Sequence, residues 1–331
     1  MAGHPHPISR RTALAGAAAA LAGSALAAAA PPAFARAPMR NSPAPGFHRF
    51  RLGAFELTVV SDGPLALGAP KDDILIGLSG EAFTKALADN YLPTDDVQLE
   101  QNVLVVNTGD RLVLFDTGIG SLKVMGPNSG RLLANLAAAG IAPADIDAVV
   151  LTHAHPDHCF GLVTDDGVRV FPNAGLHLAQ ADLDFWTDEG KLGNDALKWM
   201  VEGARKHLRP YRDRIAFVRD GAEVLPGIQA IAAPGHTVGH TVYMITSEGK
   251  TLLVAGDLGH HHVLSTERPR LAFVFDTDGA QAVASRLRLY DMLATDRIPF
   301  VGYHFPWPGV GHVGRHGDAF RYYPVPMRTV L

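Results

Sequence analysis

Four side chains of the kinds that bind metals fall within six residues, in the run His153-Ala154-His155-Pro156-Asp157-His158. An apolar, β-branched segment at 148–151 directly precedes the run, so we expect the ligands to leave the end of a strand together. Imidazole and carboxylate groups suit zinc and other borderline transition ions. The spacing lets His153 and His155 face one ion while Asp157 and His158 face a neighbouring one. A lone histidine pair is usually a packed structural feature, but four such residues at this density predict a metal centre.

Three more candidate ligands follow strand-like segments later in the chain. They are His236 in Pro234-Gly235-His236-Thr237-Val238-Gly239-His240, Asp257 after Val254-Ala255-Gly256, and His304 after Gly302-Tyr303. Each comes after small or apolar residues, as expected where several backbones crowd round an ion. The second histidine of the first segment, His240, is expected to contact the ligands rather than the ion.

Composition excludes some classes of partner and one kind of cross-link. The 331-residue chain has a formal net charge of −4, and a nucleic-acid surface would need a basic stripe instead. Its one cysteine, Cys159, rules out an intramolecular disulfide, and we interpret it as a small buried hydrophobic residue rather than a ligand.

The first 35 residues are predicted to be a twin-arginine export signal. Arg10 and Arg11 precede an Ala/Leu run, and Ala33-Phe34-Ala35 offers small residues for cleavage. An Ala-rich membrane anchor is the alternative, but alanine is weakly apolar and Gly16 and Gly23 interrupt the run, so no stable membrane insertion is expected. We therefore expect the twin-arginine export machinery as a partner and a periplasmic or secreted location. A Pro-rich linker at 36–46 then leads into one domain at 47–331.

Hydrophobic patterning predicts an α/β fold. Strands are expected at 47–50, 54–60, 102–107, 112–115, 148–151, 169–171, 176–179, 215–218, 227–232, 241–245, 251–255 and 298–303. Helices are expected at 81–89, 128–139, 182–188, 194–208 and 277–293. Two similar halves of strands and helices predict two sheets packed face to face with helices outside, a four-layer αββα sandwich. The long segment 64–100 lacks clean periodicity and is expected to be a functional loop or a partner surface.

The ligand order resembles that of the metallo-β-lactamase superfamily of metallohydrolases, over about residues 47–324. The resemblance implies one ion held by His153, His155 and His236, a second held by Asp157, His158 and His304, and Asp257 as the bridge between them. It also implies that Asp116 supports the site, although a simple turn former would look the same in sequence. Zinc is the default metal for these ligands, with Mn, Fe or Co as alternatives.

Within the superfamily, the chain is similar to methyl parathion hydrolase and its lactonase relatives. The segments that carry this likeness are 233–241, 256–258, 304–312 and 320–326. Homoserine lactone lactonases usually have a tyrosine shortly after the bridging aspartate, whereas His260, His261 and His262 stand here. His260 is the nearest substitute for a side chain that binds the carbonyl oxygen, and a solvated loop is the alternative reading of the three histidines.

Two ions a few Å apart would lower the pKa of a bridging water and supply hydroxide at neutral pH. Asp157 is expected to pass a proton to the leaving group, and Asp257 to hold the ions and orient the hydroxide. The resemblance implies an aromatic pocket above the metals, for which the candidates are Trp186, Trp199, Met200, Phe273 and Phe305. Each of these could instead be ordinary core. Together they favour an apolar ester-like substrate over a highly charged one.

The sequence therefore predicts a secreted dinuclear hydrolase of lactones or aryl esters, with organophosphate triesters as further candidate substrates. A β-lactam or thioester hydrolase of the same fold is the alternative, and a non-catalytic metal-binding scaffold is the alternative from another class. The resemblance also suggests a homodimer formed through residues 64–100.

We expect His153→Ala to abolish hydrolysis, because it removes a ligand from the run on which the centre depends. Turnover of a panel of esters and lactones by the metal-replete variant is the measurement. Full activity in this variant would show that the run is not the catalytic centre.

Overall fold

The computed structural model describes residues 39, 44 and 46–331. The chain divides into two compact units, 1–44 and 45–331, and the fold described below is that of the second. The predicted export signal at 1–35 lies outside the described residues. Among the residues that are described, no helix has the length and apolar character needed to cross a membrane.

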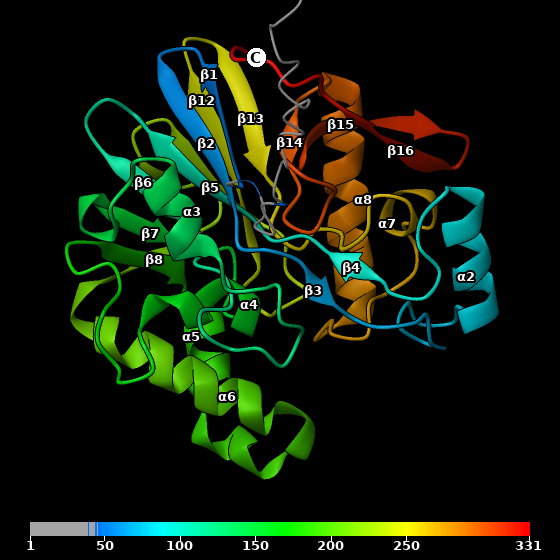
Figure 1. Cartoon of the computed structure of the whole chain (residues 1–331), viewed down its shortest axis with the longest axis horizontal. Helices are drawn as coiled ribbons and strands as arrows, with labels where there is room; N and C mark the ends of the chain where they lie inside the picture. The colour runs from blue at the N-terminus through cyan, green and yellow to red at the C-terminus, as the bar shows by residue number, and fades with distance from the viewer. Residues whose placement is uncertain (1–38, 40–43, 45) are drawn as a thin grey trace, which may run out of the picture. The chain divides into compact units, whose positions relative to one another are not determined.

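Two seven-stranded sheets form the centre of the fold (Figure 1). The first sheet has the order β1-β2-β5-β6-β7-β8-β9, with β1 at Phe47–Leu52, β2 at Phe55–Ser61, β5 at Asn102–Asn107, β6 at Leu112–Phe115, β7 at Ala148–Val150, β8 at Gly175–Ala179 and β9 at Ile215–Val218. The second has the order β10-β11-β12-β13-β14-β15-β16, with β10 at Glu223–Leu225, β11 at Ile228–Ala232, β12 at Thr241–Ser247, β13 at Lys250–Val254, β14 at Phe300–Val301, β15 at Val310–His316 and β16 at Ala319–Pro324.

Helices cover the outer face of each sheet. The first sheet carries α3 at Leu132–Ala138, α4 at Pro156–Cys159, α5 at Gln180–Thr187 and α6 at Asp195–Leu208. The second carries α7 at Leu264–Glu267 and the long α8 at Gly279–Asp296. The predicted four-layer αββα sandwich is therefore confirmed.

Strand β5 shows how the sequence builds these layers. Its side chains alternate between the two faces of the sheet. Val103 and Val105 enter the outer core beneath α3 and α6, whereas Leu104 and Val106 enter the central core between the sheets. Because both faces are covered, the strand reads as a continuous apolar run.

The segment 64–100 contains the helix expected at 81–89 and two short strands that its sequence pattern does not reveal. It forms β3 at Leu65–Ala66, α2 at Gly80–Asp89 and β4 at Gln98–Leu99. These elements bury a small core of their own, which also includes Leu264 and Phe273. The segment thus packs against the region that follows Asp257 in the chain.

Two sequence predictions for strands are wrong. Residues 169–171 form no strand, and only an isolated bridge joins Val163 to Arg169. The predicted last strand at 298–303 shortens to β14, and two further strands, β15 and β16, follow it. Glycines interrupt the apolar alternation of β15, because the Tyr322 ring of β16 packs directly over Gly311.

Gly203 lets α6 approach the turn after α4, because a Cβ at this position would overlap the Phe160 ring. That ring is held in place by stacking on His207, with the ring centroids 4.4 Å apart. We expect Gly203→Ala to lower the free energy of unfolding by about 1–3 kcal/mol through overpacking. Urea denaturation measures the loss. Gly193→Ala is the matched control, because a Cβ there meets nothing within 4 Å, and equal effects of the two variants would refute the overpacking argument.

Candidate metal centre

The seven predicted ligands lie together at the ends of strands from both sheets. In the first sheet, β7 leads into His153 and His155, and Asp157 and His158 follow on the single turn of α4. Pro156 begins that turn, where a fixed φ is already suited to a helix. In the second sheet, His236, Asp257 and His304 follow β11, β13 and β14. The opposed sheets therefore bring residues 153 and 304 into one small volume.

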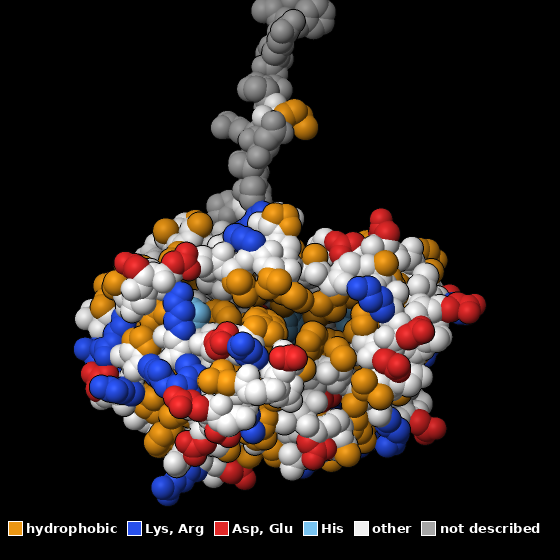
Figure 2. All heavy atoms as spheres, turned by 90° about the horizontal axis from the view of Figure 1, so that it is seen from below, with side chains coloured by type: hydrophobic (Ala, Val, Ile, Leu, Met, Phe, Trp, Pro, Cys, Tyr) orange, Lys and Arg blue, Asp and Glu red, His pale blue; other side chains and the backbone are white. Residues whose placement is uncertain are grey.

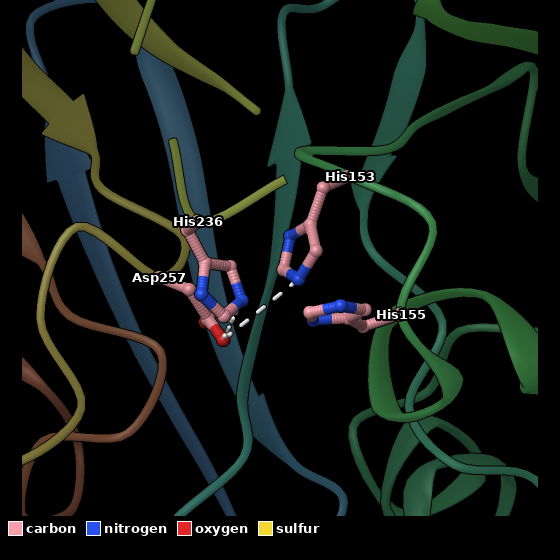
Figure 3. Close-up of side chains that lie close together, drawn as sticks. All are labelled: His153, His155, His236 and Asp257. Carbon is pink, nitrogen blue, oxygen red and sulfur yellow. Dashed lines mark ion pairs between the residues drawn. The ribbon is translucent and has the colours of Figure 1, made fainter. Parts of the chain in front are cut away.

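The ligand atoms form two groups. One holds His153, His155, His236 and Asp257, and the other holds Asp157, His158 and His304; within each group the ligand atoms lie within 4.8 Å of one another. Figure 3 shows the first group, with the rings of the three histidines and the carboxylate of Asp257 converging from opposite sides.

Asp257 lies between the two groups. Its Oδ2 is 3.2 Å from His236 Nε2 and 3.3 Å from His304 Nε2, and its Oδ1 is 3.2 Å from His158 Nε2. One carboxylate thus faces imidazoles of both groups. This is the position that the resemblance implies for a bridging ligand.

Four of the ligand histidines have their outward ring nitrogen fixed by a partner. The pairs are His153 Nδ1 with Thr152 Oγ1 (3.1 Å), His158 Nδ1 with Asp116 Oδ2 (2.9 Å), His236 Nδ1 with Asp276 Oδ1 (2.8 Å) and His304 Nδ1 with the carbonyl oxygen of Glu100 (2.7 Å). These partners hold each ring with its Nε2 toward the cluster. Asp116, which is expected to support the site, contacts His158.

The inner atoms fit a bound cation. Within the described residues, the buried Nε2 atoms of His153, His158 and His236 and the Oδ1 of Asp257 have no hydrogen-bond partner. Buried polar atoms rarely stay unpaired, so this set of nitrogen and carboxylate donors matches the needs of divalent transition ions.

The charges of the cluster point the same way. Burial lowers the pKa of His236 and His304, but Asp257 and other carboxylates outweigh it and raise the values to about 9 and about 10. Burial would raise the pKa of Asp257, yet the charged imidazoles of His304 and His158 hold it well below its ordinary range. In the metal-free protein, protons on the rings supply the positive charge that the carboxylates need, and metal binding would release them.

Asp182 of α5 ties the two ligand loops to each other. Its Oδ2 accepts a hydrogen bond from the backbone N–H of Ala154 at 2.7 Å, and its Oδ1 accepts one from the N–H of Gly239 at 2.7 Å. Ala154 lies between two ligands of the first sheet, and Gly239 lies in the loop that carries His236. The buried carboxylate thus fixes the spacing between the halves of the centre.

The neutral ring of His240 holds the backbone of Asp257. Its Nδ1 donates to the carbonyl oxygen of Ala233 at 3.0 Å, which leaves Nε2 to accept from the backbone N–H of Asp257 at 3.1 Å. Burial lowers the pKa of His240 to about 3, so the ring stays uncharged and keeps its acceptor. The expected contact between His240 and a ligand is therefore present.

Sequence reasoning missed Asp276, Asp182 and Thr152. Thr152 stands next to the ligand run, so its neighbour His153 could have drawn attention to it. Asp276 and Asp182 are isolated acidic residues without a motif, and only the fold brings them to the ligand loops.

An apolar pocket opens onto the cluster. Its lining comprises the ligands His155, Asp157, His236, Asp257 and His304 together with Leu65, Leu67, Leu99, Ile119, Met125, Pro156, Trp199, Met200, His260, Phe273 and Phe275. On the corresponding face, the space-filling view shows hydrophobic side chains around a hollow (Figure 2). Trp199, Met200 and Phe273, which were predicted as pocket residues, lie in this lining.

The prediction that Trp186 and Phe305 line the pocket is wrong. Trp186 is 1% exposed and packs in the outer core, with its ring edge against the ring of His155 at 4.9 Å. Phe305 is 1% exposed and packs against Phe300 in the core beneath α8. Closeness to a ligand in sequence does not decide the face on which a side chain lies.

His260 is aimed at the cluster. Its Nε2 lies 3.1 Å from Asp257 Oδ2, and its ring stacks on Phe273 with centroids 3.9 Å apart. Burial lowers its pKa to about 4 despite the nearby Asp257 carboxylate, so the ring is neutral at pH 7. The expectation that His260 belongs to the site, rather than to a solvated loop, agrees with this placement.

Comparison with known proteins gives the family. The model of the metallo-β-lactamase superfamily matches residues 97–303. The chain belongs to this superfamily. Because all seven ligand residues are present, the chain is a metal-dependent hydrolase of this superfamily.

Two solved structures resemble the whole domain. The dizinc quorum-quenching lactonase AidC has a TM-score of 0.77 and 30% identity, covering 85% of this chain and 98% of its own. The hydrolase AbOPH has a TM-score of 0.78 and 28% identity, covering 86% of this chain and 99% of its own. Among curated proteins, a ribonuclease of Thermus thermophilus, TTHA0252, is 34% identical over 46% of this chain, and the match spans only 33% of that ribonuclease.

Asp276→Ala is expected to weaken metal binding roughly 10–100-fold, because the His236 ring loses the carboxylate that orients it. Competition with a chelator measures the affinity. Asp278→Asn is the control, since Asp278 caps α8 and asparagine caps equally well. Unchanged metal affinity in Asp276→Ala would contradict the role given to Asp276.

Proposed function

We propose that this protein hydrolyses neutral lactones or aryl esters at a centre of two divalent metal ions, with zinc as the default metal. The observation that carries the proposal is the lining of the pocket. Above the ligands it contains apolar and aromatic side chains, and none of its described lining residues is a lysine or an arginine. A substrate without charge fits such a pocket, whereas a carboxylate away from the reacting group would lose its hydration without gaining a counter-ion from the pocket walls.

The relatives support the ester-type substrate. AidC is a quorum-quenching lactonase that was solved with the product N-hexanoyl-L-homoserine. The lactone from which that product forms is uncharged and carries an apolar acyl chain. Leu65, Leu67 and Met125 of this protein offer apolar contacts to a chain of that kind.

The ligand geometry supports two ions. Following the two groups in the structure, we assign His153, His155 and His236 to one ion and Asp157, His158 and His304 to the other. We assign Asp257 to both ions, because its carboxylate also faces His158 and His304 of the second group. Bound ions would lower the pKa of a coordinated water and polarise the carbonyl oxygen of the substrate. The remaining chemistry belongs to side chains of the protein.

We assign the chemistry at the reacting carbonyl to Asp157 and His260. Asp157 Oδ2 lies 3.4 Å from His158 Nε2 and 3.3 Å from His304 Nε2, and the side chain is 15% exposed toward the pocket that it lines. We assign to it the transfer, to the leaving oxygen, of the proton that the attacking water gives up. Neutral His260 can donate one hydrogen bond, and we assign its partner as the carbonyl oxygen, where negative charge develops.

The alternatives fit the pocket less well. A β-lactam antibiotic carries a carboxylate, and a glutathione thioester carries more than one, so both would need a cation in the lining. Phosphate triesters are uncharged, as carboxylic esters are, and we therefore keep them as a second substrate class. A non-catalytic scaffold would not need a complete set of seven ligands with their inner atoms unpaired.

A substrate panel tests the proposal on the metal-replete protein. It contains acyl homoserine lactones, dihydrocoumarin, p-nitrophenyl esters, methyl parathion and a β-lactam, with metal content measured in parallel. We expect turnover of the neutral lactones and esters. Exclusive turnover of the β-lactam, or purification without metal and without turnover of any ester, would refute it.

We expect His260→Ala to lower kcat about 10²–10³-fold on the best substrate, the loss typical of one hydrogen-bond donor to a developing oxyanion. Metal content should stay unchanged, because His260 lies outside the two ligand groups. His262→Ala is the matched control, since its ring stacks on His261 and does not line the pocket. Equal kcat values for His260→Ala and the wild type would exclude His260 from the chemistry.

A further inference from the structure

Arg286 is a buried cation whose role the reaction chemistry does not explain. It lies on α8, on the side that faces the second sheet, and is only 2% exposed. Its recorded partners are three backbone carbonyl oxygens, and no ion pair within residues 46–331 includes it. A guanidinium without a carboxylate is costly to bury unless its hydrogen bonds are good.

All three carbonyls belong to one segment of the chain. Arg286 Nε donates to Leu258 at 2.7 Å, and Nη1 donates to Pro269 at 3.1 Å and to Leu271 at 2.7 Å. These acceptors lie 28, 17 and 15 residues before Arg286. The side chain thus holds a remote segment rather than its own helix. We call residues 258–276 the covering segment.

The covering segment carries much of the site. It starts directly after Asp257, contains His260 and Phe273, and ends at Asp276, which orients His236. Its only helix is the four-residue α7, so few of its backbone groups are fixed by regular structure. External contacts must therefore set its position.

Other contacts also pack the covering segment against α8. A Cβ at Gly259 would overlap the Tyr290 hydroxyl, which lies one turn after Arg286 on the helix. Next to Arg286, the Ser285 hydroxyl donates to the carbonyl oxygen of Pro234 at 2.7 Å, just before His236. One face of α8 therefore meets both the covering segment and the His236 loop.

We propose that Arg286 is a positioning residue, which fixes the covering segment so that His260 and Phe273 take their places over the metal centre. The proposal rests on the hydrolytic function proposed above only where it concerns catalysis. The planar fork of a guanidinium can serve several carbonyls at once, which the single ammonium of lysine cannot do in the same geometry.

The test compares Arg286→Lys and Arg286→Met with Arg288→Lys in metal-replete protein. Arg288 is the matched control, because it lies on the same helix, is exposed, and donates instead to Ala232 at 2.6 Å. Hydrogen exchange read by mass spectrometry follows the amides of the covering segment. We expect at least tenfold faster exchange there in Arg286→Lys, no change in Arg288→Lys, and equal metal content in all three proteins.

A double-mutant cycle adds a catalytic readout. If Arg286 acts through His260, the kcat/KM of His260→Ala/Arg286→Lys should lie close to that of His260→Ala alone. If the factors by which the two single substitutions lower kcat/KM multiply in the double variant, the positioning role is wrong. It is also wrong if amide exchange in Arg286→Lys is unchanged, or is faster by the same factor throughout the folded domain. If the wild-type protein turns over no ester, the hydrolytic proposal fails, while the exchange comparison still decides whether Arg286 holds the segment. Arg286→Met supplies the second measurement, since it tests the loss of all three hydrogen bonds.

Discussion

The carboxylate of Asp257 faces histidines from both sheets at distances close to 3.2 Å. This concentration of charge constrains where the strands end and how the ligand loops are held. A carboxylate buried among imidazoles is stable only if positive charge is held beside it. The strands that lead into the ligands must therefore end at the same edge of the two sheets, and the loops that carry the ligands must be held in place. The buried contacts around the centre serve that demand, as Asp182 does between two loops and His240 does at the backbone of Asp257 itself.

The pocket follows a different physical rule. Four of the ligand histidines have their outward ring nitrogen held by a partner, whereas the walls of the pocket above them are mostly apolar. In the function that we propose, the first region carries the chemistry and the second selects the substrate. The covering segment belongs to both, because it places a histidine at the cluster and a phenylalanine in the wall. Small changes in its path would alter substrate choice without touching a metal ligand.

The sequence was sufficient for the layers of the fold and for the seven ligand positions. Those ligands follow strand-like segments, and their spacing can be recognised without knowledge of the fold, as the run from His153 to His158 shows. The partners Asp276, Asp182 and Arg286 could not be found in this way, because each is a single residue brought to the site by tertiary packing. Trp186 illustrates the opposite error: it does lie near His155, but on the core side of the ring. Strand β15 was missed because Gly311 and Gly314 interrupt its apolar alternation.

The distribution of the ligands along the chain has a consequence for folding. His153 and His304 belong to different sheets, and the loop between them must close before their side chains can meet. Contacts of such long range form late and slow the search for the native state. The complete ligand set is therefore not close together in the unfolded chain, so a metal ion cannot organise both sheets in the way that the ion of a zinc finger organises its short domain. Occupancy of the complete centre would report that both halves have already found each other, which makes metal content a natural measure of native-state integrity in any variant of this protein.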